Sequence, residues 1–312
     1  MNTVPESRKS LDVIIVNWNS GPFLEKCIRS LYSSATSMDF RIIVVDNNSD
    51  DGSCDSLSVR DSDIIVKLES NIGFAGACNE GAKRSSSYYL LFLNPDTEVG
   101  RTTLDDAVRY LDSEPLTGIL GVRQESAGGH VMPSCSRFLT IRNLINDATG
   151  LSKIIPRLMK PSTVMTDWDH GYSSYVDQVM GSFMLVRRDD FNTLGGFDER
   201  FFVYFEDMDF ARRMLDYGKK SFYNNDIRIV HRGGASSEKI MAERLFYSLS
   251  SRIKYADKHL GKSKKNMIIL ISLFPEFITR SIYALFRVNG FRGFKDVLKG
   301  YRLFIKWLTA GS

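Results

Sequence analysis

The stretch from residue 11 to residue 49, LDVIIVNWNSGPFLEKCIRSLYSSATSMDFRIIVVDNNS, decides the fold class. Two short apolar runs rich in β-branched residues, 11–16 and 41–45, enclose a segment with helical spacing that begins at Gly21 and Pro22. Apolar runs of this length joined by a helix are typical of parallel strands that are buried on both faces. The pattern therefore predicts a β-α-β unit of a doubly wound sheet.

The same alternation of strands and helices continues to about residue 125. We expect further strands at 64–68 and 88–93 and helices at 74–84 and 102–111. The strand at 88–93, YYLLFL, is apolar without interruption, which indicates that it is fully buried. A Rossmann-like α/β sheet with mostly parallel strands and flanking helices is therefore the expected fold class.

The second half of the chain is less regular. Residues 150–174 mix proline, glycine and polar residues without a period, so we expect a long surface loop there. The elements expected beyond it are a strand at 181–188, a short helix from Asp189, a helix at 206–217, short strands at 220–223 and 227–230, and a long helix at 238–260.

The composition is that of a soluble globular protein. The chain has 312 residues, of which 43% are hydrophobic and 25% charged, so a disordered, collagen-like or coiled-coil chain is excluded. The net charge of +4 is unevenly placed: residues 262–312 hold ten Lys and Arg against Glu276 and Asp296, giving +8 and leaving −4 elsewhere. Because apolar residues interleave with the charges of this tail, an anionic lipid surface is favoured over nucleic acid as its partner.

We divide the chain into a domain at 1–261 and an amphipathic helical tail at 262–312. Pro275, Glu276 and Arg280 interrupt the apolar run of the tail, so we expect no membrane-spanning segment. We expect the tail to lie in the membrane interface. The alternative is a helical subdomain packed on the rest of the chain or on a second subunit. The aromatic residues expected in the head-group region are Phe274, Phe277, Tyr283, Phe286, Phe291, Phe294, Tyr301, Phe304 and Trp307.

The cysteines show neither a CxxC pair nor any other metal-type spacing, and no secretory apolar segment precedes them. We therefore expect reduced thiols in a cytoplasmic protein. The four positions are Cys27, Cys54, Cys78 and Cys135.

Polar residues follow three of the expected strands. Asn17 follows the first, Asp46 and Asn48 the second, and Asn94 and Asp96 the fourth. Carboxyl ends of parallel strands line the ligand crevice of an open α/β sheet, so these segments point to one site, although Asn and Asp also simply form turns. Asp46 could accept a hydrogen bond from a nucleobase or a ribose hydroxyl. A carboxylate held at a strand end, as Asp96 is, suits Mg²⁺ or Mn²⁺.

The segment at 71–81, NIGFAGACNEG, supplies glycines where the backbone must approach another group closely. Asn71 and Gly73 stand at its start, where the N-terminus of the following helix favours anions. The segment is not a GxGxxG motif, so the dinucleotide-binding fingerprint is absent.

An acidic cluster, Glu206, Asp207 and Asp209, follows an aromatic run. Acids at a helix start are expected from the helix dipole alone. Asp207 beside apolar aromatic residues would be desolvated, which raises the pKa of a carboxyl group toward that of a general base. Asp209 and Arg213 are four residues apart and are better suited to a structural ion pair.

His231 ends the last expected strand and precedes a glycine pair, so its imidazole could reach a metal, although a lone histidine is usually structural. His130, His170 and His259 have no such context and are expected at the surface.

Taken together, the sequence resembles the glycosyltransferase family 2 enzymes, most closely their rhamnosyltransferase-like branch. The matching stretches run in order from Val13 to about Ser237, and the tail after Gly261 lies outside them. They are VIIVNWNS, IIVVDNNSDDGS, NIGFAGACNEGAK, LFLNPDTEV, GSFMLVRR, GGFDERFFVYFEDMDFARRM and IVHRGGASS.

The resemblance implies a GT-A fold, a nucleotide-sugar donor, a divalent metal (Mg²⁺ or Mn²⁺) and inversion at the anomeric carbon. It implies that Asp46 contacts the base and that Asp96 is the last carboxylate of a DxD-type metal motif whose first position is Asn94. Asp207 matches the second acid of the ED motif, the base that deprotonates the acceptor hydroxyl, and His231 matches a further metal ligand. The remaining residues expected to bind nucleotide or substrate are Asn17, Asn48, Asn71, Gly73, Gly181 and Glu206.

The resemblance further implies transfer of L-rhamnose from dTDP-L-rhamnose to a polyprenyl-diphosphate-linked or oligosaccharide acceptor. The setting would be bacterial surface polysaccharide synthesis, such as that of O-antigen, at the inner face of the cytoplasmic membrane, with homo-oligomers possible and no nucleic acid involved. A UDP-hexose or UDP-N-acetylhexosamine donor is the first alternative.

Two alternatives fall outside this activity. A sugar-phosphate nucleotidyltransferase would need a glycine-rich basic loop after the first strand, where this chain has NWNSGPF. A catalytically inactive membrane scaffold is opposed by the joint presence of Asp46, Asp96, Asp207 and His231.

Overall fold

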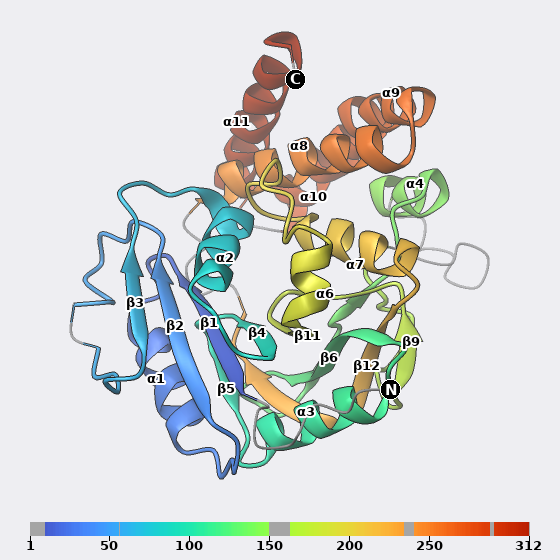
Figure 1. Cartoon of the computed structure of the whole chain (residues 1–312). Helices are drawn as coiled ribbons and strands as arrows, with labels where there is room; N and C mark the ends of the chain where they lie inside the picture. The colour runs from blue at the N-terminus through green and yellow to red at the C-terminus, as the bar shows by residue number, and fades with distance from the viewer. Residues whose placement is uncertain (1–9, 56, 150–162, 234–239, 288–289, 312) are drawn as a thin grey trace. The chain divides into compact units, whose positions relative to one another are not determined.

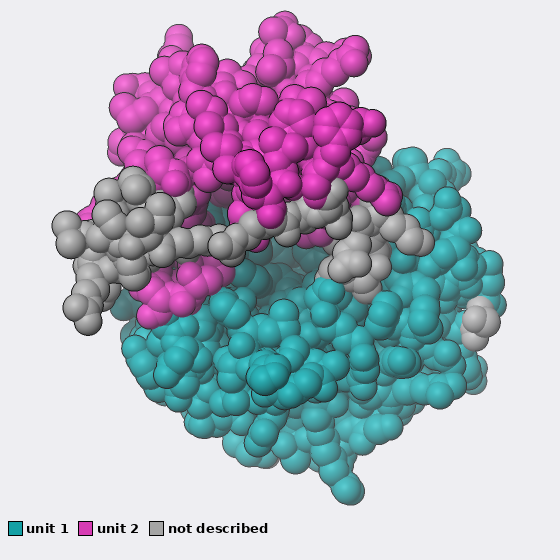
Figure 2. Space-filling view, turned by 180° about the vertical axis from the view of Figure 1, so that it is seen from behind, with its two compact units in different colours: residues 1–136, 168–199, 206–236 teal, residues 137–167, 200–205, 237–312 magenta. Residues whose placement is uncertain are grey.

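The computed structural model describes the chain except residues 1–9, 56, 150–162, 234–239, 288–289 and 312. The chain divides into two compact units, which are coloured separately in Figure 2. Unit 1 comprises residues 1–136, 168–199 and 206–236, and unit 2 comprises residues 137–167, 200–205 and 237–312. Residues 237–261 thus group with the tail, and the expected domain boundary after residue 261 stays a prediction.

Unit 1 is built on a ten-stranded mixed sheet with the order β3-β2-β1-β4-β11-β6-β12-β5, to which β7 adds beside β6 and β9 beside β12 (Figure 1). β1 pairs in parallel with β2 and β4, whereas β11 runs antiparallel between β4 and β6. The expected α/β fold class is confirmed. The strands are β1 Leu11–Asn17, β2 Phe40–Asp46, β3 Ile64–Lys67, β4 Tyr89–Leu93, β5 Thr97–Val99, β6 Thr117–Glu125, β7 Val131–Met132, β9 Ser174–Val176, β11 Phe183–Arg187 and β12 Lys220–His231, with β8 Cys135–Ser136 and β10 Gln178–Val179 forming a separate pair.

Helices cover both faces of this sheet. Val13 and Ile15 of β1 belong to an apolar cluster that includes residues of α1 and α3. Ile14 points to the opposite face, where α2 comes so close that a Cβ on Gly81 would lie 2.5 Å from its Cγ2. Burial on both faces explains why β1 is an uninterrupted buried run. The helices of unit 1 are α1 Pro22–Tyr32, α2 Gly73–Lys83, α3 Thr103–Ser113, α6 Arg188–Thr193 and α7 Glu206–Asp216.

Two strands of the sheet, β6 and β12, differ from expectation. β6 was not predicted, and β12 is one strand rather than two short strands at 220–223 and 227–230. The register of β12 on β6 shifts between Asn224 and Arg228, which marks a bulge. The Asn224 side-chain oxygen accepts the N–H groups of Asp226 and Ile227, so the strand continues across the polar residues that we read as a break.

Part of the segment expected as a long surface loop, residues 150–174, is buried in unit 1. Residues 150–162 of it lie outside the described residues. His170, which we placed at the surface, is buried: its Nε2 accepts the Ser134 N–H at 3.3 Å, and the Trp168 ring stacks on its ring at 4.3 Å. The surface assignment of His170 is wrong because Trp168 and Tyr223 enclose the ring. His130 is exposed, as expected.

Unit 2 is helical in its described part. Tyr301 and Phe304 of α11 are buried inside the unit, where α11 packs against α8 and α10, so their expected place in a membrane interface is wrong. His259 is half-buried beside Tyr255 rather than at the surface. The helices are α4 Ile141–Thr149, α8 Met241–His259, α9 Lys262–Ile271, the π-helical turn η3 Ser272–Glu276, α10 Phe277–Arg287 and α11 Gly290–Thr309.

One helix, Lys262–Phe286, is long and apolar enough to cross a membrane, with a mean hydropathy of 1.6 and 28% of its most apolar window buried. This finding corrects the expectation that no segment qualifies. Pro275 does not end the helix, because the wider turn of η3 carries the chain past the residue that lacks an N–H. Core helices of soluble proteins pass the same test of length and composition.

Candidate active site

Asn17 and Asp46 close two neighbouring strands and stand opposite each other in the β1–β2 register. The buried amide nitrogen of Asn17 lies 3.0 Å from Asp46 Oδ1 and within 3.3 Å of the side chains of Ser49, Ser53 and Cys54. An amide has only two N–H groups, so these acceptors share them. Asn17 thus fixes Asp46 and the following loop, and its direct contact with a nucleotide stays a prediction.

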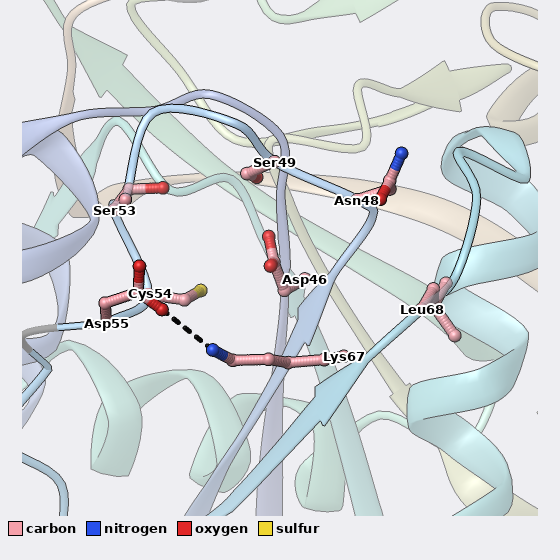
Figure 3. A pocket seen from close by; sticks show the side chains of 9 residues that line it. Asp46, Asn48, Ser49, Ser53, Cys54, Asp55, Lys67 and Leu68 are labelled. Atoms are coloured by element: carbon pink, nitrogen blue, oxygen red, sulfur yellow. Dashed lines mark hydrogen bonds and ion pairs between the residues drawn. The ribbon is translucent and has the colours of Figure 1, made fainter.

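A cavity of about 190 Å³ lies beside Asp46 (Figure 3). Burial, and then the Asp46 charge, raise the pKa of Cys54 to about 12, so this thiol keeps its proton. Lys67, at the end of β3, pairs with Asp55 at 2.8 Å. The cavity therefore presents acceptors, donors and one cation to a polar heterocycle. Its lining consists of Asp46, Asn48, Ser49, Gly52, Ser53, Cys54, Asp55, Lys67 and Leu68.

Asn47, which is not among the expected site residues, connects this strand end to the start of α2. Its amide nitrogen donates to Asn71 Oδ1 at 3.0 Å and to the Gly73 carbonyl at 3.1 Å, and its oxygen accepts the Ile72 N–H at 2.9 Å. Gly73 has a φ of 83°, which favours glycine. The expected residues Asn71 and Gly73 are thereby brought to the carboxyl end of β2, beside Asp46.

Asp96 and His231 are far apart in sequence and meet because β5 pairs with β12, with His231 opposite Thr97. His231 Nε2 lies 3.3 Å from Asp96 Oδ1. The Arg232 N–H also donates to the Asp96 carbonyl at 3.1 Å, which fixes the two backbones together. The structure thus brings the two expected metal ligands side by side.

The other ring nitrogen of His231, Nδ1, lies 2.8 Å from Gln124 Oε1. Gln124 is buried on β6, and its amide nitrogen donates to Ser182 Oγ at 2.5 Å. Because an amide oxygen only accepts, Nδ1 carries a proton, and Nε2 is the ring nitrogen that faces Asp96. The sequence analysis missed Gln124 because it missed β6. The signal that could have found it is a glutamine at the end of an apolar run, GILGVRQ.

The pair of Asp96 and His231 fits a divalent metal. Two electron-pair donors 3.3 Å apart repel each other unless a proton or a cation lies between them. Adjacent ligands of an octahedral Mg²⁺, each about 2.1 Å from the metal, are about 3 Å apart. Within the part of the chain that the structure describes, no three His, Cys, Asp or Glu residues gather as a metal site.

Asp207 stands in the first turn of α7 and is held by backbone groups. Its Oδ2 accepts the Gly181 N–H at 3.2 Å and its Oδ1 accepts the Met208 N–H at 2.8 Å. The carbonyl oxygen of Ser182, the residue after Gly181, accepts the N–H of Asn94 at 3.1 Å. Through Ser182 and Gln124, the segment that holds Asp207 also holds His231. The expected base and the expected metal ligands therefore belong to one hydrogen-bonded network.

Glu206 and Asp207 are neighbouring acids in a poorly solvated place. Glu206 is buried, and its Oε2 has no hydrogen-bond partner among the described residues. Burial raises the pKa of Glu206 well above its usual range, and the Asp207 charge raises it further. Burial also raises the pKa of Asp207, but the N–H groups of Met208 and Gly181 oppose the rise. The protein therefore compensates the buried charge of Asp207 with two N–H groups and leaves Glu206 Oε2 without such a partner among the described residues.

Asp209 is already engaged by the protein. It is fully buried, and its Oδ2 accepts from Arg213 Nε at 2.8 Å, which confirms the expected ion pair. The same guanidinium donates to the carbonyls of Leu194 and Gly196. Of the acids in this cluster, Asp207 alone combines a backbone-fixed carboxylate with partial exposure.

This fold is that of glycosyltransferases, and the sequence is similar to theirs. Residues 12–147 match the family model described as glycosyl transferase family 2. A solved structure with the same fold is the mannosyltransferase PcManGT from Pyrobaculum calidifontis in complex with GDP-Man and Mn²⁺. Its TM-score is 0.54 at 16% identity, and the likeness covers 100% of this chain and 79% of that chain. The expected GT-A fold is thereby confirmed.

Two curated relatives point to a particular branch of the family. The N-acetylglucosaminyl-diphospho-decaprenol L-rhamnosyltransferase of Mycobacterium tuberculosis is 27% identical over 273 residues, which cover 80% of this chain and 85% of the relative. The rhamnosyltransferase WbbL of Escherichia coli is 25% identical over 278 residues, covering 84% of this chain and 98% of the relative. The resemblance to the rhamnosyltransferase-like branch is confirmed by these relatives.

Proposed function

We propose that this glycosyltransferase transfers L-rhamnose from dTDP-L-rhamnose, with inversion, to a polyprenyl-diphosphate-linked saccharide in bacterial surface polysaccharide synthesis. The names of the Mycobacterium tuberculosis and Escherichia coli relatives support the sugar, and the former also supports a lipid-linked acceptor. The structural observation that carries the proposal is the network that joins Asp96 and His231 to Asp207.

In the proposed reaction, Asp207 removes the proton from the acceptor hydroxyl. The acceptor oxygen attacks the anomeric carbon from the side opposite the diphosphate. The bond between that carbon and the phosphate oxygen breaks, and the nucleoside diphosphate leaves with the electron pair. A positioned base of this kind contributes about 10²- to 10⁴-fold. One attack at the anomeric carbon, without an enzyme-bound sugar, inverts its configuration.

Asp96 Oδ1 and His231 Nε2 would hold Mg²⁺ or Mn²⁺ in this enzyme. When bound, such an ion neutralises the negative charge of the leaving diphosphate. Gln124 keeps His231 in the tautomer that offers Nε2. No second carboxylic acid is needed to protonate the leaving group, in contrast to glycoside hydrolases.

The cavity beside Asp46 is the proposed nucleobase site. Asp46 would accept the ring N–H of thymine, and Asn48 lines the same cavity. Asn71 and Gly73 lie at the N-terminus of α2, whose positive dipole end favours a phosphate. Asn94, Gly181 and Glu206 surround the proposed base and metal ligands, and their contact with the sugar is part of this proposal.

We propose a cytoplasmic enzyme attached peripherally to the inner face of the membrane, because the acceptor is lipid-linked and residues 262–312 are strongly basic.

A donor panel tests the proposed activity. The enzyme with Mn²⁺ and a polyprenyl-diphosphate-linked N-acetylglucosamine is offered dTDP-L-rhamnose, UDP-glucose, UDP-galactose and UDP-N-acetylglucosamine. Transfer from dTDP-L-rhamnose alone, with an inverted anomeric carbon by NMR, is expected. Preferred use of a UDP-sugar would replace the donor assignment, and a retained configuration would refute the mechanism.

Nucleotide binding separates an enzyme from an inactive scaffold. A ligand at 100 times its Kd adds about 2.7 kcal/mol of stability. Stabilisation by dTDP that depends on Mn²⁺ is therefore expected in a thermal scan. A chain that neither dTDP nor UDP stabilises would support the scaffold.

A further inference from the structure

The helix formed by α9, η3 and α10 carries a stripe of apolar side chains on its outer face. From Met267 to Ile282 these side chains recur every three to four residues, so they lie on one side of the helix, and Tyr283, Leu285 and Phe286 widen the exposed apolar surface at its end. Their exposed fractions range from 41% to 81%, which is high for such large apolar groups. We call this set the outer stripe: Met267, Leu270, Phe274, Ile278, Ile282, Tyr283, Leu285 and Phe286.

The inner face of the same helix is partly polar. Ser272 and Glu276 are buried there. Arg252 of α8 donates to Glu276 at 2.5 Å and to Ser272 Oγ at 3.2 Å, and Arg280 donates to Glu276 at 2.8 Å. A surface helix of a water-soluble protein turns its apolar side inward and its charges outward. This helix buries Ile268, Ile271 and Ala284 on its inner side but also leaves large apolar side chains exposed on its outer side.

The outer stripe itself has no charge to solvate it. The only charged residues between Met267 and Phe286 are Glu276 and Arg280, and they pair with each other. A continuous apolar surface of this kind is unusual on a monomeric soluble protein and marks a contact with an apolar partner. The stripe covers 20 residues, or about 30 Å of helix, at 1.5 Å per residue.

Charge decides which apolar partner fits. Residues 262–312 carry a net charge of +8, and Glu276 is buried in its ion pairs. Two copies of the chain facing each other through this region would therefore repel, whereas an anionic lipid surface would attract it. The exposed basic residues of this part of the chain are Lys262, Lys264, Arg280, Arg292, Lys295, Lys299, Arg302 and Lys306.

We propose that the outer stripe lies in the head-group and upper acyl region of an anionic bilayer, with the helix parallel to the membrane plane. A transverse orientation is disfavoured because Glu276 and Arg252 would be carried to the middle of the bilayer. The inference deepens the proposed function, on which it rests for the lipid-linked acceptor, by naming the surface that holds the enzyme at that lipid.

A fluorescent label on the stripe tests the contact directly. The four natural cysteines are buried, so the thiol of Ile278→Cys is the accessible one for an NBD label. Leu116→Cys is the matched control, because Leu116 is an equally exposed apolar residue of unit 1. With vesicles of equal parts phosphatidylglycerol and phosphatidylcholine, the label at 278 should brighten and shift to the blue, and the label at 116 should not.

Substitution of the stripe tests its share of the binding in the full-length chain. Phe274→Asp and Ile278→Asp should each lower affinity for the same vesicles about tenfold or more, because each removes one large apolar contact. Leu116→Asp should bind like the unchanged protein. Deleting residues 262–312 is a poorer test, because α11 packs against α8 and its loss would uncover that helix.

Several results would overturn the inference. Unchanged vesicle binding by both stripe variants would remove the stripe from the contact. A blue-shifted label without lipid, together with a doubled molecular mass, would assign the stripe to a second copy. Stripe variants should keep Mn²⁺-dependent dTDP binding. If the stripe variants lose vesicle binding but the unchanged enzyme uses no sugar donor, the proposed function fails and the membrane contact of the stripe stands. If the stripe variants bind vesicles normally and the unchanged enzyme transfers sugar, the membrane contact fails and the proposed function stands.

Discussion

Each compact unit buries a small group of charged side chains, and the two groups are built in opposite ways. In unit 1, the nearest charge that perturbs the buried Glu206 is another carboxylate, Asp207. In unit 2, Glu276 lies between Arg252 at 2.5 Å and Arg280 at 2.8 Å. Burial alone would raise the pKa of all three acids. It does so for Glu206 and Asp207, whereas the two guanidinium groups outweigh it and lower the pKa of Glu276 to about 2.

The difference distinguishes Glu276, which stabilises the fold, from Glu206 and Asp207, whose arrangement suits the proposed catalysis. A buried carboxylate between two cations is neutralised and connects the helices that supply its partners. Two buried carboxyl groups side by side destabilise the folded state, and such uncompensated pairs concentrate at functional sites. The contrast predicts that Glu276 matters for stability and Asp207 for rate.

The largest expected effect is that of Asp207→Asn on the rate. The substitution keeps the shape but removes the base, so kcat should fall about 10²- to 10⁴-fold. Binding of dTDP should not change, because the proton is transferred only in the chemical step. The matched control is Asp189→Asn, the same change at an exposed acid in the first turn of α6. Normal turnover by Asp207→Asn, measured with saturating donor, would show that Asp207 is not the catalytic base.

Glu276→Gln should act on stability instead. It leaves Arg252 buried without its carboxylate, which costs about 3–5 kcal/mol. The pKa of Glu276 is lowered from 4.5 to about 2, so its stabilising effect is present above pH 4.5 and is lost as the pH falls through 2. Urea unfolding at pH 7 measures the effect. The exposed pair of Glu243 with Lys299 supplies the control, because Glu243→Gln should cost less than about 1 kcal/mol. Equal losses in the free energy of unfolding for Glu276→Gln and Glu243→Gln would show that the buried ion pairs of Glu276 stabilise the fold no more than the exposed pair of Glu243.

Gln124 offers a smaller effect that links the metal ligands to the rest of the site. Gln124→Leu removes the acceptor for His231 Nδ1–H, so Mn²⁺ affinity in the presence of dTDP should fall about 10- to 100-fold. Gln124→Glu still accepts that proton and should retain the affinity. Mn²⁺ titration followed by electron paramagnetic resonance compares the two variants. Similar losses in both would point to a packing defect rather than to the orientation of His231.

The smallest expected effect is a gain of stability from Glu206→Gln. Because the pKa of Glu206 is raised, its ionisation penalises folding once the pH exceeds the usual value of 4.5. The neutral amide removes this penalty, so the thermal midpoint at pH 7 should rise by about 2 °C or more. The gain should vanish near pH 4, where glutamate is protonated in both states. If Glu206→Gln is less stable than the unchanged protein at pH 7, the ionised Glu206 carboxylate must have stabilising partners in the folded state.

The sequence predicted those parts of the site that depend on single strands. β1, β2 and β4 are apolar enough to be recognised alone, and the polar residues that end β1 and β2 do come together, because Asn17 contacts Asp46. The i,i+4 pair of Asp209 and Arg213 also follows from spacing alone.

Other parts depend on partners that are distant in sequence. β6 contains Gly118 and Gly121 and ends in three polar residues, and it becomes a strand because β11 and β12 enclose it. Gln124 was missed for that reason. In the tail, periodicity identified amphipathic helices but not which side faces the protein. Phe304 turned out to face inward and Phe274 outward, because buried ion pairs occupy the inner face beside Phe274.

The strand order of unit 1 has a consequence for the order in which the site is made. β11 lies between β4 and β6, and β12 lies between β6 and β5, so both late strands insert between strands that are synthesised earlier. A nascent chain that has left the ribosome up to β6 cannot close its sheet, because the strand that belongs between β4 and β6 does not yet exist. Asp96 is made early but gains His231 only when β12 has emerged. A chain released before residue 231 therefore lacks the contact between Asp96 and His231 altogether. If the two residues hold the metal as proposed, the site is complete only after β12 has been made.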